Sequence, residues 1–133
     1  MSREYAVQMM YQLSMTEGTT EEVIFTFWKS FDKPDDNIAE FAERLFTNAA
    51  INKDEHDRLV SQFLKDTWTF DRLGEMEKCI FRVAIDELLN GDTPAYVVMN
   101  EYVALASRFT DDKTTLFVNG MLESIRNEFS DKK

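Results

Sequence analysis

The sequence predicts an all-α protein, built as a compact bundle of about seven helices in two packed helical subdomains. Apolar residues recur at three- and four-residue spacing along most of the chain, which is the period of a helix buried on one face. Strand-like alternation is missing from the sequence, and only 4 Gly and 2 Pro interrupt its 133 residues. A 44% hydrophobic content is sufficient for one core, so residues 1–133 are expected to form a single domain.

The first three helices are expected between residues 3 and 49. Residues 3–15 carry the first apolar stripe, and Gly18 follows as a stop signal. Thr19 and Glu22 have the spacing of a capping box, so a second helix should begin there and reach Phe31. Pro34 then breaks the chain ahead of a third apolar stripe over residues 38–49.

The next boundaries follow from capping signals and from proline. Asn52 repeats the capping spacing ahead of a fourth helix that extends to about residue 64, and the two subdomains should divide near Thr67. Pro94 is expected to open a sixth helix that ends near Phe109. A seventh helix should begin at Thr114 or the residue after it.

The fifth helix, residues 75–90, is expected to be the most buried one. Its polar residues form one narrow stripe, and most of the remaining circumference is apolar: the stripe contains Glu75, Lys78, Arg82 and Asp86. Gly91 is expected to cap its C-terminus. Glu77 and Glu87 fall outside the stripe, and a buried unpaired carboxylate is very costly. Each should therefore meet a donor or reach solvent at a helix end, and Glu77 in the first turn is favoured by the helix dipole.

Gly120 interrupts the apolar pattern of the seventh helix. A glycine inside a helix costs about 1 kcal/mol relative to alanine, so it usually marks the close approach of another backbone or of a ligand. On local grounds a helix crossing is the favoured interpretation, and a ligand contact remains the alternative.

The residues that commonly carry catalysis or metal binding are scarce. The chain has one cysteine, Cys79, and one histidine, His56, which cannot make a common zinc site. His56 lies among charged residues and is expected to face solvent. The four glycines are isolated, so no phosphate-binding loop is predicted. The sequence therefore predicts no enzyme, no metal and no cofactor.

Cysteine content and hydropathy indicate the compartment. A single cysteine excludes an internal disulfide and fits a reducing environment. No stretch approaches the roughly 18 apolar residues of a membrane span, and the N-terminus lacks the apolar core of a signal peptide. A cytoplasmic protein without a membrane partner is expected.

The net charge limits nucleic-acid binding. With 15 Lys and Arg against 25 Asp and Glu, the chain carries −10 and repels a polyanion at long range. Any RNA contact should therefore be local or supported by a more basic partner. The first helix offers such a local surface, because Arg3, Gln8 and Tyr11 bring a cation, an amide and a stacking ring near one face.

Five segments, taken in order, resemble the NusB family of bacterial transcription antitermination factors. They are REYAVQMMY at 3–11, WTFDRL at 68–73, EKCIFRVAIDEL at 77–88, PAYVVMNE at 94–101 and FVNGML at 117–122. The resemblance implies a helical fold of two subdomains and a role in processive antitermination of ribosomal RNA transcription. It also implies pairing with NusE, a ribosomal protein that doubles as a transcription factor. The pair would capture boxA RNA and tether it to the RNA polymerase elongation complex.

The resemblance and the pattern of the first helix together nominate ten site residues. The candidate RNA-binding residues are Arg3, Gln8, Tyr11, Phe109 and Lys113. The candidate partner-binding residues are Glu77, Lys78, Asn100, Glu101 and Asn119.

Two departures from the family pattern keep a second interpretation open. Only Met1 and Ser2 precede Arg3, where many family members have a longer arginine-rich arm, and the loop at 110–113 lacks the usual small residues. The alternative is a helical protein-interaction module, with a homodimer as one form, that has lost independent RNA binding.

Overall fold

The computed structural model describes residues 1–65 and 68–130, and all of its regular structure is helical. The elements are α1 (Ser2–Ser14), α2 (Thr20–Ser30), α3 (Asp36–Ile51), α4 (Lys53–Phe63), a 3-10 helix η1 (Phe70–Arg72), α5 (Glu75–Asn90), α6 (Ala95–Phe109) and α7 (Asp112–Ser130). This confirms the prediction of an all-α fold with about seven helices. None of the described helices is long and apolar enough to cross a membrane.

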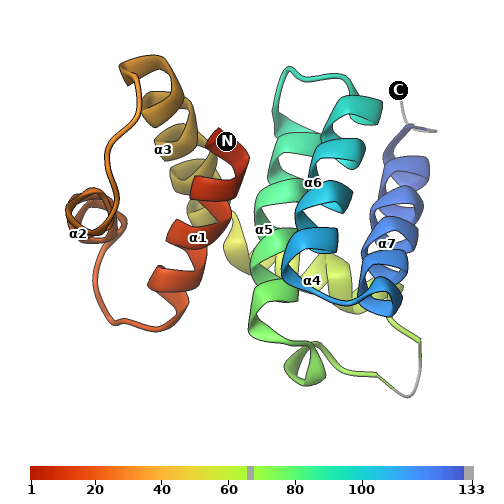
Figure 1. Ribbon diagram of the computed structural model, residues 1–133. Helices are drawn as coiled ribbons and strands as arrows, with labels where there is room; N and C mark the ends of the chain where they lie inside the picture. The colour runs from red at the N-terminus through yellow and green to blue at the C-terminus, as the bar shows by residue number, and fades with distance from the viewer. Residues whose placement is uncertain (66–67, 131–133) are drawn as a thin grey trace.

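The helices form two groups around α5. Figure 1 shows α1, α2 and α3 on one side and α5, α6 and α7 side by side on the other, with α4 crossing behind them. Because α4 contacts α5 and α7, it belongs to the second group. The two groups therefore meet at Asn52, between α3 and α4, while the predicted division near Thr67 lies outside the described residues.

The prediction that α5 is the most buried helix is confirmed. Every residue from Cys79 to Glu87 is buried, and α5 contacts α1, α3, α4, α6 and α7. Burial in this apolar setting raises the pKa of Cys79 to about 11, so the thiol stays protonated and behaves as a core residue.

The polar stripe of α5 is the surface on which α4 packs. Arg82 donates from Nε and Nη2 to the two carboxylate oxygens of Asp57, at 2.8 and 2.9 Å. One turn further on, Asp86 Oδ1 accepts a hydrogen bond from Asn52 at 3.0 Å and lies 2.9 Å from His56 Nε2. The stripe thus joins two helices through an ion pair and buried hydrogen bonds.

The expectation that His56 faces solvent is wrong, because the residue is only 4% exposed. Its charged sequence neighbours occupy other faces of α4, while the ring points at Asp86. Burial alone would raise the pKa of Asp86, but hydrogen bonds from His56, Asn52 and Asn90 outweigh burial and lower it.

The predicted helix starts at Thr19 and Asn52 agree with the structure and that of the seventh helix differs, although only one of the two predicted side-chain caps forms. The capping box of Thr19 and Glu22 forms, with each side chain accepting from the other's backbone N–H. Asn52 does not cap α4, because its side chain donates to Asn48 and Asp86 instead. The seventh helix begins at Asp112 instead of Thr114 or Thr115; the Asp111 carboxylate accepts the Thr114 N–H at 2.7 Å. This hydrogen bond lowers the pKa of Asp111.

Two glycines differ in what surrounds them. Gly91 ends α5 as predicted, and a Cβ there would lie 2.6 Å from the Glu87 carbonyl oxygen, so the close approach requires glycine. A Cβ on Gly120 would meet no described atom within 4 Å. The favoured interpretation of Gly120 as a helix crossing is therefore wrong, and its ligand alternative stays open.

Candidate nucleic-acid interface

Four predicted site residues lie at helix ends on the same side of the molecule. Tyr11 is in the last turn of α1, Glu77 in the first turn of α5, Phe109 is the last residue of α6, and Lys113 is the second residue of α7. Figure 1 shows these four helix ends at the lower end of the molecule. The two hollows found there contain three of these residues.

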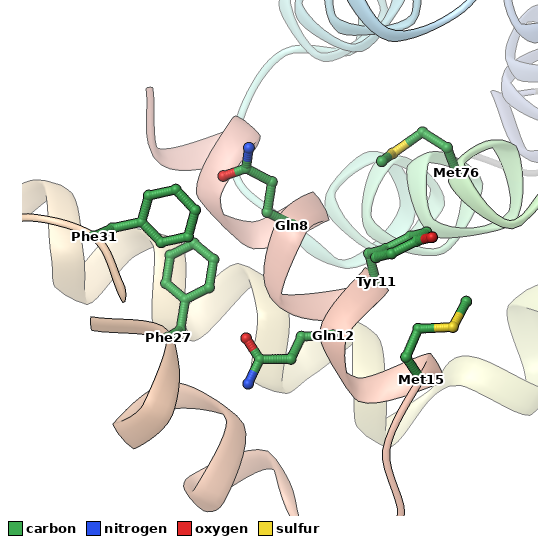
Figure 2. A pocket seen from close by; sticks show the side chains of 7 residues that line it. All are labelled: Gln8, Tyr11, Gln12, Met15, Phe27, Phe31 and Met76. Atoms are coloured by element: carbon green, nitrogen blue, oxygen red, sulfur yellow. The ribbon is translucent and has the colours of Figure 1, made fainter. Parts of the chain in front are cut away.

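The first hollow, here called the α1 groove, has a volume of about 380 Å³. Its lining consists of Gln8, Tyr11, Gln12, Met15, Phe27, Phe31 and Met76. Figure 2 shows Tyr11 and Met15 on the side of α1 that faces Met76 of α5, with Phe27 and Phe31 across from them on the α2 side. Tyr11 is 38% exposed, and its ring lines the groove, where it is available for stacking.

Amides supply the polar part of the α1 groove. Gln12 Nε2 donates to Thr26 Oγ1 at 2.6 Å and so ties α1 to α2. Gln8 Oε1 is buried, and the described structure gives it no hydrogen-bond partner. No charged residue occurs among the described lining residues, so the α1 groove offers stacking and amide contacts rather than charge.

The second hollow, here called the α4–α7 cleft, is larger, at about 690 Å³. It is lined by Phe63, Leu64, Lys65, Trp68, Arg72, Leu73, Gly74, Glu77, Lys113, Thr114, Phe117, Gly120, Met121 and Ser124. Three cations, Lys65, Arg72 and Lys113, meet here with one acid among the described lining residues. The cleft is therefore locally positive in a chain of net charge −10.

An exposed indole lies beside these cations. Trp68 is 54% exposed, and its backbone N–H donates to the Lys65 carbonyl at 2.8 Å, which holds the two residues together. Aromatic rings next to cations are the combination that binds single-stranded nucleic acid through stacking and phosphate contacts. Gly120 adds an open surface on α7, since it lines the cleft without a side chain.

The first turn of α5 joins the two hollows. Met76 lines the α1 groove, and the next residue, Glu77, lines the α4–α7 cleft. Gly74 begins this helix without a side-chain cap, and Glu77 Oε1 would lie 3.2 Å from a Cβ on Gly74. Glu77 thus folds back over the positive end of the helix dipole, which is the favourable place expected for it.

Arg3 is held inside the molecule. Its Nε and Nη2 donate to Glu87 Oε1 and Oε2 at 2.9 and 2.7 Å, and its side chain is 18% exposed. Glu87 also accepts the Tyr102 hydroxyl at 2.8 Å, so the prediction that this buried carboxylate meets donors is confirmed. Burial and the Glu87 charge raise the pKa of Tyr102 well above its ordinary value. An RNA contact by Arg3 stays a prediction.

The remaining predicted residues lie outside both hollows. Lys78 Nζ lies 3.6 Å from Glu75 Oε2 and is positioned over the Phe70 ring. Asn100 and Glu101 are exposed on α6, and Asn119 is half-buried on α7. Phe109, which is 37% exposed, also lies outside them, beside Arg108.

The sequence pattern does not single out Lys65, Trp68 and Arg72 as candidate RNA-binding residues. They lie between two helical patterns, where no amphipathic period fixes the direction of a side chain. Their spacing of three and four residues, with an aromatic ring between two cations, was the available signal. Their relation to Lys113 depends on how α7 packs beside α4, which the sequence does not express.

The fold is an all-helical domain with two hollows at one end, one of which is lined by three cations. The NusB family model matches residues 1–127, so the chain belongs to the NusB family. This confirms the resemblance predicted from the sequence. Relatives in this family are named transcription antitermination proteins.

Relatives and solved structures are similar over most of the chain. The transcription antitermination protein NusB of Staphylococcus aureus (strain JH9) is 40% identical over 127 residues, covering 94% of this chain and 95% of that protein. Its counterpart from Anaeromyxobacter dehalogenans (strain 2CP-1) is 29% identical over 124 residues, covering 93% and 87%.

Two solved structures share the fold. A chain in the crystal structure of antitermination factors NusB and NusE with double-stranded RNA has a TM-score of 0.87 at 23% identity, covering 96% of this chain and 94% of that one. T. maritima NusB has a TM-score of 0.82 at 26% identity, covering 96% and 89%.

Proposed function

We propose that this protein is a cytoplasmic transcription antitermination factor that binds boxA RNA in nascent ribosomal RNA transcripts together with NusE. In this role it supports processive elongation by RNA polymerase. Membership of the NusB family supports the antitermination role. The shared fold with a chain from a complex of NusB, NusE and double-stranded RNA suggests the two partners.

The α4–α7 cleft is the observation that carries this proposal. Lys65, Arg72 and Lys113 would contact phosphates, which supplies affinity without sequence preference. Trp68 would stack on a base, and stacking is worth about 1–3 kcal/mol per base. Such a concentrated site reconciles RNA binding with the acidic balance of the whole chain.

The RNA would continue from the cleft across the first turn of α5 into the α1 groove. There Tyr11 offers its exposed ring and Gln8 an amide. Phe109, at the end of α6, would provide a further aromatic contact. This path uses four of the five candidate RNA-binding residues directly.

NusE would meet the candidate partner-binding residues, which lie outside the two hollows except for Glu77 at the edge of the α4–α7 cleft. Asn100 and Glu101 form an exposed polar surface on α6, with Asn119 on the neighbouring α7. Glu77 and Lys78 extend the surface toward the first turn of α5. A basic partner held there would add the positive charge that this chain lacks at long range.

Titration of fluorescently labelled boxA RNA against the heterodimer with NusE tests the cleft. Lys113→Gln should weaken binding and lower the slope of log K against log salt by about 0.7, the value for one phosphate contact on a single strand. Trp68→Ala should weaken binding without changing that slope. Lys33→Gln, which removes the same charge from the exposed connection between α2 and α3, is the matched control.

The outcomes separate the proposal from its alternative. Equal losses for Lys113→Gln and Lys33→Gln would show that the cleft is not the RNA site. If the wild-type heterodimer does not bind boxA RNA, the protein-interaction module is the better description. Sedimentation of the isolated protein would then show whether a homodimer forms.

A further inference from the structure

A buried network outside the proposed RNA path joins α1 to α5 and α6. Arg3 of α1, Glu87 of α5 and Tyr102 of α6 are joined by three hydrogen bonds of 2.7–2.9 Å. Glu87 is 2% exposed and Tyr102 is fully buried, so the network lies inside the bundle. The Arg3 guanidinium also lies 5.4 Å from the centre of the Phe41 ring of α3.

The residues on either side of Arg3 strengthen this attachment. Ser2 Oγ donates to the Ile38 carbonyl of α3 at 2.9 Å, and Glu4 forms an ion pair with Arg108 of α6. The first turn of α1 is therefore fixed to three other helices by three consecutive residues. At its other end the helix is tied to α2 by the exposed hydrogen bond from Gln12.

We propose that Arg3 is a positioning residue, which holds α1 so that Tyr11 presents its ring to RNA beside Met76 of α5. Tyr11 is eight positions after Arg3, which is a rise of about 12 Å along one rigid helix. A change of tilt at the first turn is therefore transmitted to the ring. This inference rests on the proposed RNA-binding function.

Direct use of Arg3 by RNA would be costly. Two of its donors are already paired with Glu87, and moving the guanidinium to a phosphate would leave that buried carboxylate without its counter-charge, although the Tyr102 hydroxyl would still donate to it. An exposed arginine is a better phosphate ligand, because no internal partner is lost. The geometry thus gives Arg3 an indirect part in RNA binding.

A double-mutant cycle on the NusE heterodimer with labelled boxA RNA tests this role. Arg3→Ala should weaken RNA binding by up to about tenfold, the order of one base stack. The salt slope should stay unchanged, because no phosphate contact is removed. In the Tyr11→Ala background, Arg3→Ala should have no further effect. All variants are compared at a temperature where circular dichroism shows them folded.

A second variant guards against loss of the fold. Arg3→Ala leaves the buried Glu87 carboxylate without its counter-charge, whereas the double change Arg3→Ala with Glu87→Gln removes that charge and should melt higher than Arg3→Ala alone. RNA affinity in the double variant should remain reduced, because the connection between α1 and α5 is still weakened. A double variant with wild-type RNA affinity would overturn the proposal.

Three other results are decisive. A salt slope lowered by about 0.7, with an effect that persists in the Tyr11→Ala background, would make Arg3 a phosphate contact and overturn its positioning role. If Arg3→Ala lowers the melting temperature but leaves RNA affinity unchanged, Arg3 serves only the stability of the fold, and the positioning role is overturned. Absence of RNA binding by the wild-type heterodimer would instead reject the proposed function, and the positioning role with it.

Discussion

Asp86 and Glu87 are neighbouring buried carboxylates that attach α5 to different parts of the bundle. Asp86 meets His56 and Asn52 at the α4 side, whereas Glu87 meets Arg3 of α1. Successive residues of a helix point about 100° apart, so two adjacent acids can serve two interfaces. Each is matched by donors, which makes burial of the pair tolerable.

Asp86 should give the protein a defined sensitivity to acid. Its folded pKa lies below the ordinary value of about 3.9, so the carboxylate stabilises the fold above that pH. This contribution is lost as the pH falls through the lowered pKa. Asp86→Asn should therefore be less stable at neutral pH and lose less stability on acidification. Urea unfolding between about pH 6 and 3 measures both effects, with exposed Asp32→Asn as control. Parallel pH profiles for wild type and Asp86→Asn would contradict this.

Gly91 and Gly120 should respond in opposite directions to the same change. Gly91→Ala forces a Cβ to 2.6 Å from the Glu87 carbonyl and should destabilise the protein. Gly120→Ala meets no described neighbour within 4 Å and should stabilise α7 by up to about 1 kcal/mol. Thermal melts of the two variants provide the comparison. A lower melting temperature for Gly120→Ala would mean that the glycine serves the fold, and not the cleft that it lines.

The positions of the helices could be predicted from the amphipathic period of the sequence and from its capping residues. The Thr19 capping box involves residues three apart, so a local pattern suffices. Asn52 carries the same signal, yet its side chain goes to Asp86, 34 residues away. The burial of His56 is likewise not visible in the local pattern, because its partner Asp86 is 30 residues away. Packing partners at such separations are set by the arrangement of α4 on α5, which no local pattern records.

The burial of α5 makes a sharp prediction for this helix. Val83 is fully buried, so Val83→Asp places an unpaired charge in the core and should cost several kcal/mol or prevent folding. Leu116→Asp makes a similar change on α7 at a residue that is 72% exposed, and should alter stability by less than about 0.5 kcal/mol. Circular dichroism during urea unfolding compares them, and equal midpoints would refute the central place of α5.

The molecule as a whole carries a net negative charge, whereas the α4–α7 cleft is locally positive. The sequence indicated that RNA contact must be local, and its motifs named Tyr11, Glu77 and Lys113 near the gathered helix ends. It did not reveal Lys65 or Arg72, because their closeness to Lys113 arises from tertiary packing of α7 beside α4. The sequence motifs thus locate part of the candidate site, whereas the grouping of its three cations depends on the tertiary fold.

Dependence on the partner is the prediction that belongs to this scale. Isolated protein should bind boxA RNA weakly at physiological salt, because ten net negative charges oppose the approach of the polyanion. Screening limits that repulsion to a range of roughly 8 Å, so the three cations of the cleft can still act once RNA is held nearby. NusE should hold the RNA near the cleft and so increase affinity, as measured by fluorescence anisotropy with and without NusE over a series of salt concentrations.

The heterodimer should show the steeper salt dependence, since both chains then contribute phosphate contacts. Equal affinity and equal slope for isolated protein and heterodimer would show that the cleft alone recruits RNA and that the overall charge is no obstacle.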